Sequence, residues 1–157
     1  MPTYSGSKAQ SGKGSSLSIG AITGSVGTEV FILIGEIKTS GISGAQWSSE
    51  DVTNFQSGND QEFLTTTRNN GTVDISGNRI ASDAGQVAVE NAFSTGLKYD
   101  FKLVLPINQQ AGQTSVGDTY TFSALVESRD ITIDTTKAIS WGVKLKISGP
   151  VTLTVGS

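Results

Sequence analysis

Residues 51–79 read DVTNFQSGNDQEFLTTTRNNGTVDISGNR, and this stretch decides the fold prediction. Two strand-like segments, 62–68 and 72–78, are joined by Asn-Asn-Gly at 69–71. An Asn-Gly pair supplies the positive φ angles of a tight turn, so the sequence predicts a β-hairpin here. Residues 51–60 are rich in Asn, Gly, Gln and Ser and predict a long loop, a common place for a binding site.

Hydrophobic alternation predicts further strands on both sides of this stretch. Residues 29–39 (EVFILIGEIKT) are the most apolar run and predict a central strand covered on both faces. Gly35 within it indicates a bulge or a close backbone approach. Trp141 lies on the apolar face of a later strand, so we expect it in the core. These later strands are expected at 99–105, 120–126, 129–136, 141–147 and 151–155.

An α-helix is predicted at 83–95. Asp83 is the expected N-cap, Gln86 stands three residues later as in a capping box, and Gly96 is the expected stop. The apolar residues at helical spacing on one face are Val89, Ala92 and Phe93. The predicted fold class is mainly β: two packed antiparallel sheets, as a β-sandwich or barrel, with one flanking α-helix and long assembly loops.

Composition argues against catalysis and phosphate binding. Charged residues make up 16% of the chain and the net charge is −3, which disfavours a basic patch. The chain has no cysteine and no histidine, which removes disulfides, thiolate metal sites and the commonest general base. Residues 58–60 (Gly-Asn-Asp) lack the spacing of an EF-hand loop, and the sequon at 70–72 is explained better by the turn. We therefore expect no enzyme activity, no cofactor and no metal.

The chain predicts a single domain with an N-terminal arm. Residues 1–16 are rich in Gly, Ser and Lys, and form either a floppy terminus or an arm that becomes ordered only against a neighbouring subunit. Residues 17–157 form the β-sandwich domain. Trp47 stands in a polar setting and is either a lid over the core or an interface anchor. We expect a soluble, non-secreted protein, because residues 1–20 lack a signal-peptide core and the longest apolar run is too short for a bilayer.

Short motifs follow one another along most of the chain. They are GSSLSIG at 14–20, GEI at 35–37, DVTNF at 51–55, EF at 62–63, the hairpin, the helix, YDFK at 99–102, GDTYTF at 117–122 and KISGPVTL at 146–153. No single motif is specific, but the ordered set resembles the tail tube proteins of long-tailed, siphovirus-type bacteriophages. Gly85 and Ala88 depart from the bulkier residues often seen in the family's helix, which leaves the packing of the helix open.

The resemblance implies a structural role. In the family, two packed β-sheets carry a helix at the side, six subunits form a ring, and stacked rings make the tube through which DNA leaves the capsid. It implies self-assembly, with tail tip or baseplate, tape-measure and tail terminator proteins as further partners. DNA would pass through the lumen without specific binding, and no membrane is involved. The expected place is the virion tail, after assembly in the host cytoplasm.

The same analogy assigns contact surfaces. Residues 41–62 are expected to contact the adjacent ring, and the two terminal segments to help join rings. The lumen is assigned to 62–68, 72–78, 99–105 and 119–127, and a net acidic lumen would repel phosphate and let DNA slide. The expected inter-subunit or inter-ring contacts are Trp47, Asp51, Asn54, Phe55, Asp60 and Glu62. The expected lumen hairpin carries Arg68, Asn70 and Asp74.

Two other functions stay open at this point. One is the tube protein of a related contractile injection or type VI secretion system. The other is a monomeric β-sandwich module that binds a carbohydrate or a cell surface, which would need exposed aromatic side chains on one sheet face.

Overall fold

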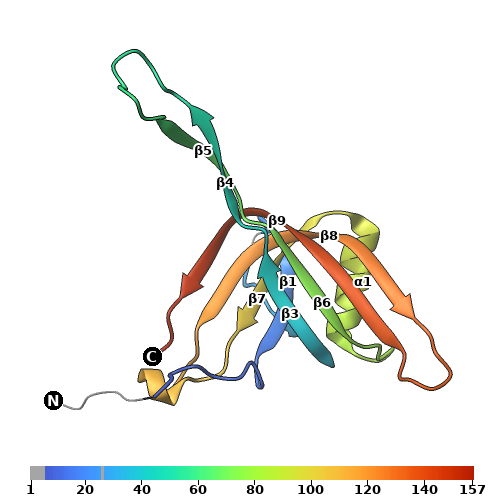
Figure 1. Cartoon of the computed structure of the whole chain (residues 1–157). Helices are drawn as coiled ribbons and strands as arrows, with labels where there is room; N and C mark the ends of the chain where they lie inside the picture. Colours follow the sequence, from blue (N-terminus) through green and yellow to red (C-terminus); the bar gives the residue numbers. More distant parts are fainter. Residues whose placement is uncertain (1–5, 26) are drawn as a thin grey trace.

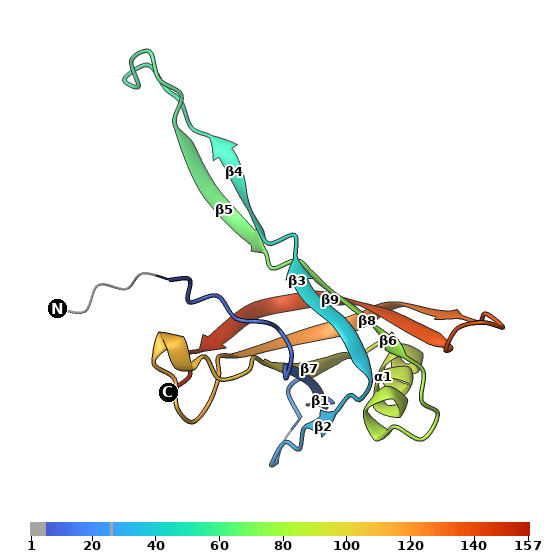
Figure 2. The ribbon, with the colours of Figure 1, turned by 60° about the horizontal axis from the view of Figure 1, so that its bottom comes forward.

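The computed structural model describes residues 6–25 and 27–157, so the first five residues of the predicted arm lie outside the described chain. A curved seven-stranded antiparallel sheet forms the body, in the order β2-β1-β7-β8-β9-β6-β3, and β4 with β5 forms a ribbon that projects from it (Figures 1 and 2). The elements are β1 (Ser16–Ile22), β2 (Ile32–Leu33), β3 (Ile37–Ser43), β4 (Gln46–Asp51), β5 (Phe63–Asn69), β6 (Thr72–Asn78), α1 (Ala84–Thr95), β7 (Lys98–Val104), the 3-10 turn η1 (Gln109–Ala111), β8 (Thr119–Thr132) and β9 (Ser140–Thr154).

The predicted fold class is confirmed: the described chain is mainly β, with antiparallel sheets, sandwich-like packing and a flanking helix. The sheet does not close into a barrel, because in the part of the chain that the structure describes it ends at β2 on one side and β3 on the other. Figure 2 shows the sheet curling so that these two edges approach one side of the body.

The core lies on the concave face of the sheet, under α1. Buried and outward-facing residues alternate along β6 and along the first half of β9, as the period-two pattern predicts. Trp141 is only 1% exposed, which confirms its predicted place in the core, and the rings of Phe101 and Phe122 stack at 5.8 Å. The buried apolar residues are Leu17, Ile19, Ile34, Val73, Ile75, Val89, Ala92, Phe101, Leu103, Phe122, Ala124, Val126, Trp141, Val143, Leu145 and Ile147.

The helix begins and ends where its capping residues predict. The Asp83 carboxylate accepts a hydrogen bond from the Gln86 backbone N–H at 2.9 Å, and Gly96 adopts a left-handed φ of 68°. The buried stripe runs through Gln86, Val89 and Ala92, while Phe93 of the predicted stripe stays partly exposed. The helix ends are therefore confirmed and its buried face is turned slightly from the predicted one.

A buried glutamine joins α1 to two neighbouring segments. Gln86 is fully buried, and its amide nitrogen donates to the Asn78 and Gly35 carbonyls at 2.8 and 3.1 Å. Its amide oxygen accepts from the Ile80 backbone N–H at 3.0 Å and from Arg79 at 3.1 Å. Both donors and both acceptor sites of the amide are used, so its burial in the core leaves none of its polar atoms without a hydrogen-bond partner.

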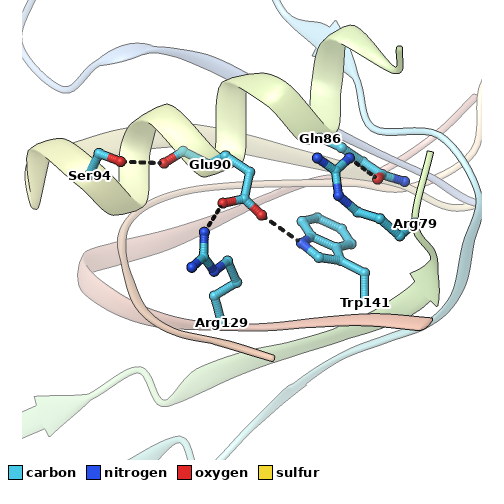
Figure 3. A network of polar contacts seen from close by, with 6 residues as sticks. All are labelled: Arg79, Gln86, Glu90, Ser94, Arg129 and Trp141. Carbon is cyan, nitrogen blue, oxygen red and sulfur yellow. Dashed lines mark hydrogen bonds and ion pairs between the residues drawn. The ribbon is translucent and has the colours of Figure 1, made fainter. Parts of the chain in front are cut away.

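A second polar cluster joins the side of α1 that faces the sheet to the long strands (Figure 3). Glu90 accepts a hydrogen bond from the Trp141 indole N–H at 3.2 Å and forms an ion pair with Arg129 of β8. The Arg129 guanidinium also lies over the Phe93 ring, 5.2 Å from its centroid. The helix is thus attached to the sheet by both apolar and polar contacts.

Gly85 explains how the helix packs without a bulky residue at this position. A Cβ atom on Gly85 would lie 2.2 Å from the Leu33 carbonyl oxygen and 2.5 Å from the Ile34 Cα. Only a glycine lets α1 come this close to the β2 segment. The departure from the family pattern noted in the sequence is therefore a requirement of this packing.

The prediction of a central strand at 29–39 is wrong. This run is broken by a turn in which Glu36 has a φ of 59°, and it yields β2 and β3, the two outer strands of the sheet. Gly35 does allow a close approach, as predicted: its N–H donates to Asp83 at 3.1 Å, and a Cβ would lie 2.5 Å from that carboxylate. The helix cap thus holds the turn that separates the two strands.

The last four strands predicted from alternation are two long strands, paired with each other. Segments 120–126 and 129–136 merge largely into β8, and 141–147 and 151–155 merge largely into β9. Irregularities in register, between Phe122 and Ala124 and between Val126 and Ser128, account for the interrupted alternation.

Candidate functional site

The candidate site is the projecting ribbon. The prediction of a tight hairpin at 69–71 is wrong. β5 pairs with β4, whereas β6 pairs with β3 and β9, so the two predicted hairpin strands do not pair with each other. The chain instead makes one long excursion from β3 through β4, a tip at 52–62, and back through β5 to β6 (Figure 1). Asn69-Asn70-Gly71 changes the direction of a strand that continues.

Two glycines in the short links between strands, Gly44 between β3 and β4 and Gly71 between β5 and β6, form the neck between body and ribbon. Gly44 and Gly71 have φ angles of 81° and 88°, which suit glycine best. A Cβ on Gly71 would lie 1.9 Å from the Ser43 carbonyl oxygen, so no other residue fits there without movement of the backbone. We define the neck as residues 44–45 and 70–71.

The neck is attached to β9. The Ile147 N–H donates to the Gly71 carbonyl at 3.1 Å, and the Asn70 side-chain amide donates to the Gly149 carbonyl. The Asn69 side chain accepts from the Gly71 N–H at 2.9 Å. The base of the ribbon therefore has a defined position against the sheet, although the ribbon itself extends away from it.

The ribbon has no core of its own. Every residue of β4 and of β5 is exposed to solvent. Trp47 is 52% exposed, and the Arg68 guanidinium lies 5.4 Å from its ring centroid. Trp47 is therefore not a lid over the core, and of the two predicted roles only an interface anchor is compatible with its place. Large apolar side chains exposed on the ribbon are Trp47, Val52, Phe55, Phe63 and Leu64.

The tip of the ribbon is ordered by its own polar groups. The Val52 N–H donates to the Glu62 carbonyl at 2.9 Å, and the Glu62 N–H donates to the Thr53 hydroxyl at 2.9 Å. Asn54 closes the turn by accepting from the Gln56 N–H at 2.9 Å. Phe55 lies fully exposed in this turn. The tip thus presents an aromatic ring to solvent from a turn of defined shape.

The far end of the ribbon is negatively charged. Residues 46–62 contain Glu50, Asp51, Asp60 and Glu62 but no lysine or arginine, and Arg68 is the first cation after them. The Thr53 hydroxyl and then its backbone N–H hold the pKa of the Asp51 carboxyl below its ordinary value, so this group stays ionised. The tip therefore combines negative charge with an exposed aromatic side chain.

The six residues predicted as contacts all lie on this one element. Trp47 and Asp51 are on β4, Asn54, Phe55 and Asp60 are in the tip, and Glu62 immediately precedes β5. The three residues assigned to a lumen hairpin do not share a hairpin: Arg68 is on the ribbon, Asn70 in the neck and Asp74 on β6. Their role in a lumen stays a prediction.

Sequence reasoning missed the neck and the exposed apolar residues of β5. A usable signal was present, because Gly44 and Gly71 stand before and after the polar tip and a strand-like segment separates each from it. Among the described residues there is no group of three or more acidic, His or Cys side chains that could hold a metal. No helix in the described ranges is long and apolar enough to cross a membrane.

Comparison with known proteins finds similarity to solved structures but not to family models or curated sequences. No family model and no curated protein sequence matches the chain. The tail of an empty gene transfer agent particle, refined with C6 symmetry, is similar with a TM-score of 0.69 at 20% identity, over 94% of this chain and 100% of that one. The SPP1 tail tube gives 0.63 at 18% identity, over 91% and 77% of the two chains.

A chain from a contractile assembly is similar to this one with nearly the same TM-score. The sheath–tube complex of an extracellular contractile injection system gives a TM-score of 0.63 at 13% identity, over 90% of this chain and 88% of that one. The chain therefore has the fold found in tail tubes and in contractile injection systems, and the likeness covers nearly its whole length. The resemblance to tail tube proteins drawn from the sequence is confirmed at the level of the fold.

Proposed function

We propose that this protein is the structural subunit of a tail tube, in which six-membered rings stack to form a conduit for DNA. The observation that carries the proposal is the ribbon: a surface of thirteen strand residues, all exposed, on a chain whose fold is that of tube-forming proteins. An isolated two-stranded ribbon is marginally stable in water, so such a surface is expected to be covered in the working assembly.

The open edges of the sheet support assembly within a ring. β2 and β3 end the sheet, and an unpaired edge readily joins a strand of another chain. The printed C6 symmetry of a similar tail favours six copies in the ring. The role is non-enzymatic and needs no cofactor. Further partners are the tail tip or baseplate, the tape-measure protein and the terminator, and the place of action is the virion tail after assembly in the host cytoplasm.

The arm and the domain boundary belong to the same proposal. Residues 1–16 form an arm that helps to join rings, and residues 17–157 form one domain. Where the arm is described, it lies against the loop after β7: Asn108 donates to the Lys8 carbonyl at 3.0 Å, and Gln10 donates to the Pro106 carbonyl at 3.2 Å. The carboxyl end lies close by, since the Ser157 N–H donates to Val116 at 3.1 Å.

The acidic lumen depends on which face of the sheet lines the tube. The convex face, opposite the core, carries Lys98, Lys102, Lys144 and Lys146 together with Asp74, Asp100 and Asp130. A lumen lined by this face would not repel DNA through a net negative charge. The acidic-lumen hypothesis therefore requires another surface, and a map of the assembled tube with these lysines in its bore would reject it.

A tube of a contractile injection system is the second candidate, because a structure from such a system matches this fold. A micrograph of the native assembly decides between the two by the presence or absence of a contractile sheath. The third possibility, a monomeric carbohydrate-binding module, has no exposed tryptophan on the seven-stranded sheet of the described chain. The exposed tryptophan stands on the ribbon, and the other is buried in the core.

The proposal is tested by negative-stain electron microscopy and sedimentation of the purified protein over a concentration series. We expect rings or hollow tubes with a regular repeat. A protein that stays monomeric at every concentration, also with preformed tail tips as seeds, and that binds on a glycan array would contradict the proposal and favour the binding module.

A further inference from the structure

A groove at the end of the body away from the ribbon has the chemistry to receive the ribbon tip of a second copy. The groove has a volume of about 920 Å³ and is lined by residues 12–17, 33–40, 103 and 105. Its lining includes the first half of β3, whereas the neck follows the last residue of β3. The ribbon therefore leaves the body at the end of β3 that is farther from the groove and extends away from it, so a chain does not fill its own groove.

The walls of the groove are mixed: six of the sixteen residues that line it are apolar, and three of these, Leu17, Ile34 and Leu103, are themselves buried. Leu17, Leu33, Ile37, Leu103 and Leu105 line it, and Leu33 is more than half exposed. The lining comes from the segment that leads into β1, from the segment that links β2 to β3, and from the end of β7. An aromatic side chain that enters this space would remove apolar surface from water on both partners.

The charges of the groove complement those of the tip. Lys13 and Lys38 line the groove, and the one acidic residue in the lining, Glu36, already accepts a hydrogen bond from Asn78 at 3.0 Å. The tip offers Asp51, Asp60 and Glu62 around the exposed Phe55, with no cation between residues 39 and 67. Opposite charges at the rim and an aromatic anchor at the centre are the usual arrangement of a specific protein interface.

We infer that the groove lined by residues 12–17 and 33–40 binds the far end of the ribbon, which is the tip at 52–62 together with Asp51, of another copy of this chain. The contact is heterologous, because the two surfaces are different and lie at opposite ends of the molecule. Such contacts continue indefinitely instead of closing on themselves, as a stack of rings requires. The inference rests on the proposed function and adds to it the surface that the ribbon meets.

Charge reversal tests the contact directly. Asp60→Lys and Lys38→Glu are each expected to reduce the pelletable assembled fraction at least about tenfold, because each places like charges together. The double variant, which exchanges the charges, is expected to recover assembly. The matched control is Lys137→Glu, which reverses an exposed lysine between β8 and β9 and is expected to assemble like the wild type.

The outcomes separate this inference from the proposed function. Wild-type tubes together with normal assembly of both single variants would overturn the groove contact and leave the tube function standing. Failure of the double variant to recover would also overturn it. Assembly of the wild type is expected to weaken as salt rises from about 50 to about 500 mM, where exposed charges are screened.

A cross-linking experiment covers the case in which the wild type forms no tubes alone. The natural chain has no cysteine, so introduced thiols report one contact each. A mixture of Phe55→Cys with Lys13→Cys is expected to give a disulfide-linked heterodimer, and a mixture of Phe55→Cys with Lys137→Cys is not. Equal yields in the two mixtures would overturn the inference.

Discussion

The body and the ribbon of this protein are built from the same kind of strand but are stabilised in different ways. In the body, strands bury one face under α1, and the core side chains are at most 9% exposed. In the ribbon, both strands are exposed throughout, and the hydrogen bonds of one strand pair together with the polar turn at the tip maintain the structure. The comparison teaches that hydrogen-bonded pairing alone can shape a surface, whereas burial stabilises the fold.

The two tryptophans provide the sharpest test of this difference. Trp141→Ala is expected to lower the free energy of unfolding by about 3–5 kcal/mol, because it leaves a cavity beside α1. Trp47→Ala is expected to change it by less than about 0.5 kcal/mol in the free subunit, since the side chain is exposed. Denaturant unfolding of the monomer measures both, and Trp141→Phe is the control that keeps most of the volume while removing the hydrogen bond to Glu90. Equal losses for the two alanine variants would contradict the comparison.

The neck is the place where the two regions meet. Gly71→Ala is expected to cost about 2–3 kcal/mol, because it combines a left-handed backbone with a clash against Ser43. Gly58→Ala in the tip also has a positive φ, but a Cβ there meets nothing within 4 Å. It is therefore expected to cost only about 1–2 kcal/mol of local strain, without affecting the body. Thermal unfolding compares the variants, and equal stabilities would show that the neck does not couple to the sheet.

Within the body, the close approach of α1 predicts a further loss. Gly85→Ala is expected to destabilise by about 1–3 kcal/mol, since its Cβ would contact the Leu33 carbonyl and force the helix outward. Gly41→Ala on β3 is the matched control: a Cβ meets nothing within 4 Å and the backbone is not left-handed, so stability is expected to stay within about 0.5 kcal/mol. An unchanged Gly85→Ala protein would show that the helix can shift at no cost.

The smallest expected effect concerns the tip. Because the pKa of Asp51 is lowered in the folded tip, its contribution is present above the ordinary pKa of aspartate and is lost as pH falls through the lower folded pKa. Thr53→Ala is expected to return the pKa of Asp51 toward its ordinary value in an NMR titration. Asp134, whose pKa Thr136 lowers in the same way between β8 and β9, serves as an internal control and is expected not to change. An Asp51 pKa that is the same in Thr53→Ala as in the wild type would contradict the described turn.

The features predicted correctly from the sequence are those that depend on neighbouring residues. The ends of α1 follow from Asp83 and Gly96, whose roles depend only on neighbouring backbone groups. The core position of Trp141 follows from alternation along a strand that is covered on one face. That the six residues predicted as contacts lie on an exposed element was also within reach, because a long polar segment between strands favours the surface.

The wrong predictions involve features whose meaning depends on distant parts of the chain. Asn70-Gly71 has the chemistry of a tight turn, but pairing of β5 with β4 and of β6 with β9 leaves it as a neck. The apolar run at 29–39 indicated a buried central strand, yet Val30 and Leu33 are exposed in the single chain. Periodicity reports which residues avoid water, and it does not report whether their cover comes from the same chain.

The neck has a mechanical consequence. Both ribbon strands continue through covalent backbone into β3 and β6, and β6 is bonded along its length to β9, so tension on the tip is carried into the sheet as shear across many hydrogen bonds. Bending is resisted as well, because the Asn70 side chain and the Gly71 carbonyl are hydrogen-bonded to β9 at the joint. The ribbon should behave as a stiff arm, and an assembly joined by such arms keeps a fixed spacing between its copies.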